Sequence, residues 1–169
     1  MRLFLDITDE QPPDVSKRRF REFSRNGMSA IGKLWDSTFK MLHFVAGAAE
    51  RYGYQRRSTK YQEGKERRVR GRSRSISPDA ANELILTGSL RRAARQNQLP
   101  RAFPTRVTIN IPTPHYVAMR PRRAGIPNLG MEMTSTLFAE RREMQDEYHR
   151  EVEEDLNNYR SPRTTRIGA

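Results

Sequence analysis

The sequence predicts an α+β fold in which two long helices pack on a small antiparallel or mixed sheet, with long basic loops or arms. Two long segments carry apolar residues at three-and-four spacing, the pattern of a helix with one buried face. Two short segments alternate apolar and polar residues, as half-buried strands do. A chain of 169 residues fits one domain, which we assign to residues 1–160, with a tail at 161–169.

The N-terminal part of the chain is expected to form a strand and then the first long helix. Three aliphatic residues alternate along 2–7, which indicates one buried strand face. Two prolines at 12–13 end this segment, and Asp14 or Ser16 can cap the next helix by accepting hydrogen bonds from its free N–H groups. The apolar stripe then continues at helical spacing to Tyr52, which predicts a helix of about nine turns. The stripe comprises Phe20, Phe23, Ile31, Leu34, Leu42, Val45, Ala49 and Tyr52.

Glycines interrupt both halves of the chain. Gly27 and Gly32 fall inside the first predicted helix and are expected to loosen it. Farther on, an apolar run at 84–86 meets Thr87 and Gly88, which lack the glycine and lysine spacing of a phosphate-binding loop. We interpret this corner as a structural hinge, in which Gly88 supplies a backbone conformation that other residues avoid and Ser89 or Thr87 can cap the following helix.

The second half of the chain is expected to contribute a short helix, a strand and the second long helix. The short helix starts near Leu90 and ends before Pro100. Residues 105–111 alternate three β-branched apolar residues with polar ones and give the clearest strand pattern in the chain. Residues 134–159 carry the second helical stripe, with acidic residues on the other faces. That stripe comprises Leu137, Met144, Tyr148, Val152, Leu156 and Tyr159.

Several kinds of chemistry are excluded or left without support. The chain has no cysteine, so disulfides, thiolate metal sites and cysteine nucleophiles are excluded. No apolar run approaches the roughly 20 residues that cross a bilayer, so we expect a soluble protein without membrane contact. His43, His115 and His149 lie on separate predicted elements, with no recognisable partners for a metal or catalytic site. We therefore expect no metal, no cofactor and no enzymatic activity.

The net charge of +12 is distributed unevenly. Residues 51–76 hold ten basic residues against two acids, and residues 84–131 hold eight arginines and no acid. Residues 132–169 hold nine acids against six arginines. This asymmetry predicts either a polyanionic partner or an acidic surface on a neighbouring copy of the same chain.

The basic segments give the candidate interaction residues. The loop predicted at 53–80 has no sustained periodicity, and its arginines have three readings: nucleic-acid contact, contact with a subunit or partner, or solvation. A second basic loop is predicted at 120–133. The interface or DNA-facing candidates are Arg67, Arg68, Arg70, Arg72, Arg74, Arg91, Arg92, Arg95, Arg120, Arg122 and Arg123. The acidic interface candidates are Glu147, Glu151, Glu153, Glu154 and Asp155.

Two stretches carry a family resemblance. The run YGYQRRSTKYQEGKERR at 52–68, followed by NELILTGSLRRAA at 82–94, resembles tailed-bacteriophage proteins of the tail-completion and virion-morphogenesis class, which are small neck or head-tail joining proteins. The resemblance covers roughly residues 30–120. The matching positions are Tyr54, Ser58, Thr59, Lys65, Leu84, Leu86, Thr87, Gly88, Leu90 and Arg91.

The resemblance implies a noncatalytic virion protein, made and assembled in the host cytoplasm. Copies of the chain would form a ring, of six or twelve, at the junction between head and tail. The other partners it implies are neck, connector and tail proteins, and possibly DNA in the channel. The basic face at 84–131 of one copy would then meet the acidic late helix of the next. The alternative prediction is a basic nucleic-acid-binding protein that uses the arginine-rich loop at 65–74.

Overall fold

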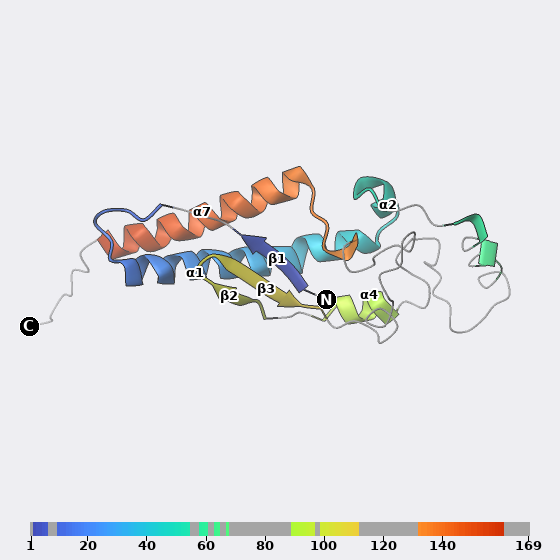
Figure 1. The fold of residues 1–169 in the computed structure, drawn as a ribbon, viewed down its shortest axis with the longest axis horizontal. Coiled ribbons are helices and arrows are strands. Elements are labelled where there is room, and N and C mark those ends of the chain that lie inside the picture. The colour runs from blue at the N-terminus through green and yellow to red at the C-terminus, as the bar shows by residue number, and fades with distance from the viewer. Residues whose placement is uncertain are drawn as a thin grey trace, which may run out of the picture.

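The structure is a computed structural model, which describes residues 2–6, 10–54, 58–60, 63–64, 67, 89–96, 99–111 and 132–160. Within these residues a helix packs against a small antiparallel sheet, and the C-terminal helix packs along that first helix (Figure 1). The predicted α+β class is therefore confirmed, and the sheet is antiparallel rather than mixed.

Three short strands form the sheet: β1 (Arg2–Asp6), β2 (Arg101–Phe103) and β3 (Arg106–Asn110). Their order is β1-β3-β2, and β3 is antiparallel to both neighbours. The alternation predicted for the central strand is observed, because Val107 and Ile109 are fully buried. β2 is a strand that the sequence analysis did not predict.

The first helix, α1 (Lys17–Leu34), begins where the capping pattern predicts. Ser16 is its cap, because the Ser16 hydroxyl accepts a hydrogen bond from the Arg19 N–H at 3.4 Å. The other candidate cap, Asp14, is used differently: its carboxylate accepts two hydrogen bonds from the Arg160 guanidinium, at 2.6 and 2.8 Å. This ion pair joins the start of α1 to the end of the C-terminal helix.

The prediction of one continuous helix to Tyr52 is wrong beyond the end of α1. The chain continues as a π-helical turn, η1 (Trp35–Phe39), then a 3₁₀-helix, η2 (Lys40–Phe44), and a short α-helix, α2 (Ala48–Arg51). Gly47, at φ +78°, separates η2 from α2 in a left-handed conformation that favours glycine. A π turn and a 3₁₀ turn change the number of residues per turn, so the inward-facing positions after α1 no longer follow α-helical spacing.

The C-terminal helix, α7 (Phe138–Arg160), starts later than the predicted boundary at residue 134. The Glu140 side chain explains this start, because its carboxylate reaches back to accept the Leu137 N–H at 3.1 Å. Three residues of the predicted apolar stripe are buried: Met144, Tyr148 and Val152.

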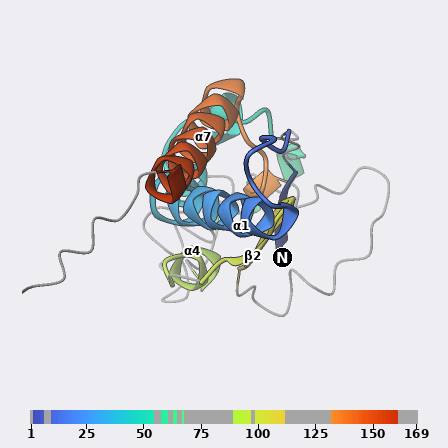
Figure 2. The same ribbon diagram turned by 90° about the vertical axis from the view of Figure 1, so that its left-hand side faces the viewer.

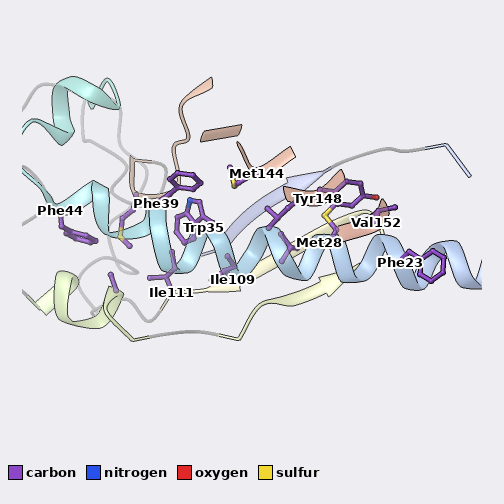
Figure 3. Close-up of a cluster of buried hydrophobic side chains, with 14 of the residues drawn as sticks. Phe23, Met28, Trp35, Phe39, Phe44, Ile109, Ile111, Met144, Tyr148 and Val152 are labelled. Carbon is purple, nitrogen blue, oxygen red and sulfur yellow. The ribbon is translucent and has the colours of Figure 1, made fainter. Parts of the chain in front are cut away.

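α1 lies between α7 and the sheet (Figure 2). One hydrophobic core runs along both of its sides and continues into η1 and η2, as Figure 3 shows. Met28, Ile31 and Trp35 supply the central part of this core. A further short helix, α4 (Ser89–Ala94), contributes Leu90 near the η2 end.

The two glycines of α1 are sites of close packing, which differs from the loosening expected of them. A Cβ atom on Gly27 would lie 2.6 Å from Cδ2 of Tyr148 on α7. A Cβ atom on Gly32 would lie 2.5 Å from Cβ of Pro100 and 2.8 Å from Cγ2 of Val107 on β3. These distances are shorter than van der Waals contact, so each glycine lets α1 approach a different neighbour.

Replacing Gly27 by valine is expected to lower the free energy of unfolding by about 2–3 kcal/mol, because the added methyl groups must displace the buried Tyr148 ring. Chemical denaturation of the full chain measures this loss. Ala30→Val is the matched control, because Ala30 lies on the same helix and lines a surface groove. Its expected loss is below about 1 kcal/mol. Equal losses in the two variants would contradict the packing role of Gly27.

Candidate functional site

Helix α4 presents the arginines that lie nearest to the predicted hinge. Leu90 and Ala94 are buried in the core and hold the helix in place. Arg92 and Arg95 are exposed, as expected for an interaction surface, whereas Arg91 is half-buried. The structure therefore leaves Arg92 of α4 and Arg95, which directly follows the helix, as the surface arginines of this segment.

A buried ion pair fixes the chain just after α4. The Lys40 ammonium lies 2.5 Å from Oδ1 of Asp36 and also donates a hydrogen bond to the Gln96 carbonyl at 3.1 Å. Lys40 and Asp36 are almost completely buried, on η2 and η1. The buried lysine thus links the irregular helical turns after α1 to the end of α4.

The remaining basic candidates fall mostly outside the described residues. Arg67 is described, is exposed, and its Nε lies 3.5 Å from the Glu63 carbonyl oxygen one turn earlier. The candidates outside the described residues are Arg68, Arg70, Arg72, Arg74, Arg120, Arg122, Arg123, Thr87 and Gly88.

Helix α7 forms an acidic surface, with eight acidic residues against four arginines. Two of the five acidic candidates are already bonded within the chain: Glu147 pairs with Arg150 at 2.5 Å, and Asp155 accepts a hydrogen bond from the Asn26 side chain at 2.9 Å. Glu151 is half-buried. The two fully exposed candidates are Glu153 and Glu154.

A groove of about 400 Å³ runs between α1 and α7. Its volume falls in the range of small-ligand pockets, which is roughly 300–1,000 Å³. Its only charged lining residues are Lys33, Glu147 and Glu151, and the rest of the lining is small or polar apart from Leu34. One of its hydroxyls is already bonded within the chain, because Ser37 donates a hydrogen bond to the Leu34 carbonyl at 3.2 Å.

A buried cluster of aromatic and polar groups lies where η2, α2 and the start of α7 meet. The His43 ring stacks on Tyr52 with 4.0 Å between centroids, and its Nδ1 lies 2.5 Å from the Tyr54 hydroxyl. Tyr52 donates a hydrogen bond to Glu140 at 2.6 Å, and Arg51 approaches the same carboxylate at 3.5 Å. No sequence pattern predicts this cluster, although Tyr52 falls on the predicted apolar stripe.

Burial keeps this cluster uncharged at its histidine and its tyrosine. Burial lowers the pKa of His43 to about 4, and the nearby Arg51 charge adds to this, whereas the backbone of Glu132 opposes it. Burial also raises the pKa of Tyr52, as does its hydrogen bond to the Glu140 carboxylate. Neither group therefore exchanges a proton near neutral pH, and the arrangement fits a structural cluster better than a general acid or base.

Neither a metal-binding group of side chains nor a membrane-spanning helix occurs in the part of the chain that the structure describes. No group of three or more histidine, cysteine or acidic side chains there is arranged to hold a metal ion. No helix there is both long enough and apolar enough to span a membrane.

Comparison with known proteins gives no relative. No protein-family model, no curated protein and no solved structure matches the chain.

The buried ion pair predicts strongly coupled substitutions. Asp36→Leu alone is expected to cost about 3–5 kcal/mol of unfolding free energy, because it leaves the Lys40 ammonium buried without a counter-charge. The double variant Asp36→Leu/Lys40→Met removes both charges and is expected to be more stable than Asp36→Leu. Denaturation of the two single variants and the double variant measures the coupling. Losses that simply add would contradict the proposed role of the pair.

The buried histidine predicts a loss of stability in acid. Between pH 6.5 and about 4 the unfolded chain binds a proton at His43 that the folded chain does not bind, so the free energy of unfolding falls as the pH is lowered. The full effect is about 3 kcal/mol, and it is complete once the pH is below the folded pKa.

The measurement compares the pH profiles of the native chain and of His43→Gln, which should lack this part of the dependence. Tyr54→Phe is the control, because it keeps the imidazole buried and removes only its hydrogen-bond partner. The prediction fails if His43→Gln and the native chain have the same profile between pH 7 and 4.

Proposed function

We propose that this chain is a noncatalytic structural protein of a tailed-bacteriophage virion. It acts at the neck or head-tail junction, where its copies assemble as a ring that completes or stabilises the connection between head and tail. The resemblance of residues 52–68 and 82–94 to tail-completion and virion-morphogenesis proteins supports this role. Its partners are other copies of itself and the adjoining neck, connector and tail proteins.

One structural observation supports assembly more than any other: α4 and α7 lie on opposite sides of α1 (Figure 2). The helix that carries the exposed Arg92, with the exposed Arg95 directly after it, therefore lies on a different side of α1 than the acidic helix α7. Opposite charges held apart in one chain can pair between two copies, and a contact between two different surfaces repeats from copy to copy. When the rotation between copies closes, such a head-to-tail contact generates a ring.

The test is a charge swap between the two surfaces. The native chain is expected to form a particle several times heavier than the 19.7 kDa monomer, measured by native mass spectrometry. Arg92→Glu/Arg95→Glu on α4, or Glu153→Arg/Glu154→Arg on α7, should each reduce this mass, because like charges would then meet at the contact. Combining all four substitutions should restore it.

The control for the swap is Arg141→Glu/Arg142→Glu, which makes the same change in net charge as the α4 variant at exposed positions of α7, adds no positive charge to its acidic surface, and should not lower the mass. A native chain that stays monomeric and is absent from purified virions would contradict the proposed function. Loss of assembly in both double variants without recovery in the combined variant would contradict the α4–α7 contact.

A further inference from the structure

The first turns of α1 carry a stripe of arginines that the proposed ring contact does not use. Arg18, Arg21 and Arg25 are exposed and follow i, i+3, i+7 spacing, which places them on one face of the helix. They span about 10 Å along the helix axis, at 1.5 Å per residue. Lys17, also exposed, precedes them. We call these four residues the α1 basic stripe.

No acid among the described residues neutralises the charges of the α1 basic stripe. Neighbouring arginines are paired: Arg19 lies 3.1 Å from Glu22, and Arg160 is bonded to Asp14. In the part of the chain that the structure describes, no ion pair or hydrogen bond to an acid is made by Lys17, Arg18, Arg21 or Arg25. The first turn of α1 also contains no acidic residue, although the helix dipole favours one there. Stability alone therefore does not explain this concentration of positive charge.

The stripe is separate from the arginines of α4. The first turns of α1 lie beside the end of α7, as the Asp14–Arg160 ion pair requires, whereas α4 packs against η2 beyond the other end of α1 (Figure 1). A partner held by the α1 basic stripe therefore need not compete with the proposed contact between α4 and α7.

The net charge of the chain selects the chemistry of that partner. Each copy carries a net charge of +12, so any assembly of identical copies keeps the whole excess, however its acidic and basic surfaces are paired. Two acids of α7, Glu147 and Asp155, already have partners within the chain, so they are less available to pair with the basic residues of another copy. A polyanion of another kind can neutralise the excess, in place of the small counterions that surround the free chain. Arginine is suited to this because its planar guanidinium donates paired hydrogen bonds to phosphate oxygens.

We propose that the α1 basic stripe binds the phosphodiester backbone of duplex nucleic acid without reading its sequence. Duplex DNA carries one negative charge per roughly 1.7 Å of its axis, so a stripe of about 10 Å meets several phosphates at once. Guanidinium contacts to phosphate oxygens position a protein on the duplex but carry no base specificity. The stripe is on a folded helix that packs into the core through Phe23, Met28 and Ile31, so it is presented without an ordering cost for the backbone.

The experiment measures how the affinity of the full chain for a short DNA duplex depends on salt. Arg18→Gln/Arg25→Gln is expected to reduce the slope of log affinity against log salt by about two, because each lost phosphate contact removes about 0.9. Arg141→Gln/Arg142→Gln is the matched control: it removes the same charge from exposed positions on α7 and should leave the slope nearly unchanged. Both variants should retain the native melting temperature and particle mass, and duplexes of unrelated sequence should bind equally.

Three results would overturn the proposal. The first is a native chain whose DNA affinity does not depend on salt. The second is an equal reduction of the slope in both variants, which would show a general effect of net charge. The third is an unchanged slope with a changed particle mass in Arg18→Gln/Arg25→Gln, which would assign the stripe to a protein contact. None of these results depends on the proposed α4–α7 contact, which has its own charge-swap test.

Discussion

The close approach of α1 to two neighbours is the constraint on which the rest of the fold depends. Gly27 lets α1 approach Tyr148 of α7, and Gly32 lets it approach Pro100 and Val107 beside the sheet. A glycine inside a helix costs about 1 kcal/mol relative to alanine, so its presence at both contacts is best explained by the packing it allows. Because the two contacts lie on different sides of α1, one helix joins both layers into a single core.

This central position also explains why the chain changes helix type after α1. Two charged residues, Asp36 and Lys40, are four positions apart on the irregular turns and are buried together as an ion pair. The Lys40 ammonium also donates a hydrogen bond to the Gln96 carbonyl. The same turns bring His43 against the two tyrosines that follow α2. Buried polar groups are stable only when they are bonded, so these contacts determine where α4 and α2 lie relative to the core.

Local patterns predicted the elements whose burial is local, and failed where a distant partner decides the structure. Alternation identified β3, and the Ser16 cap located the start of α1, because both signals depend on adjacent residues. β2 has only three residues, too few for an alternation pattern. The break after α1 was missed because apolar residues continue at nearly helical spacing through η1 and η2. The burial of Lys40 was missed because its Gln96 partner is 56 residues away.

The surface charges follow from the same packing. α1 and α7 each bury an apolar side and leave most of their charges at the surface, with Glu140 as a buried exception. α1 carries six basic residues against one acid, and α7 carries eight acids against four arginines. Contacts between copies can pair these oppositely charged surfaces, but they cannot change the net charge that each copy carries. A ring therefore accumulates positive charge in proportion to its number of copies, and the resulting repulsion opposes closure. A polyanion bound along exposed arginines lowers that repulsion, so nucleic-acid binding at α1 and assembly through α4 and α7 would favour each other.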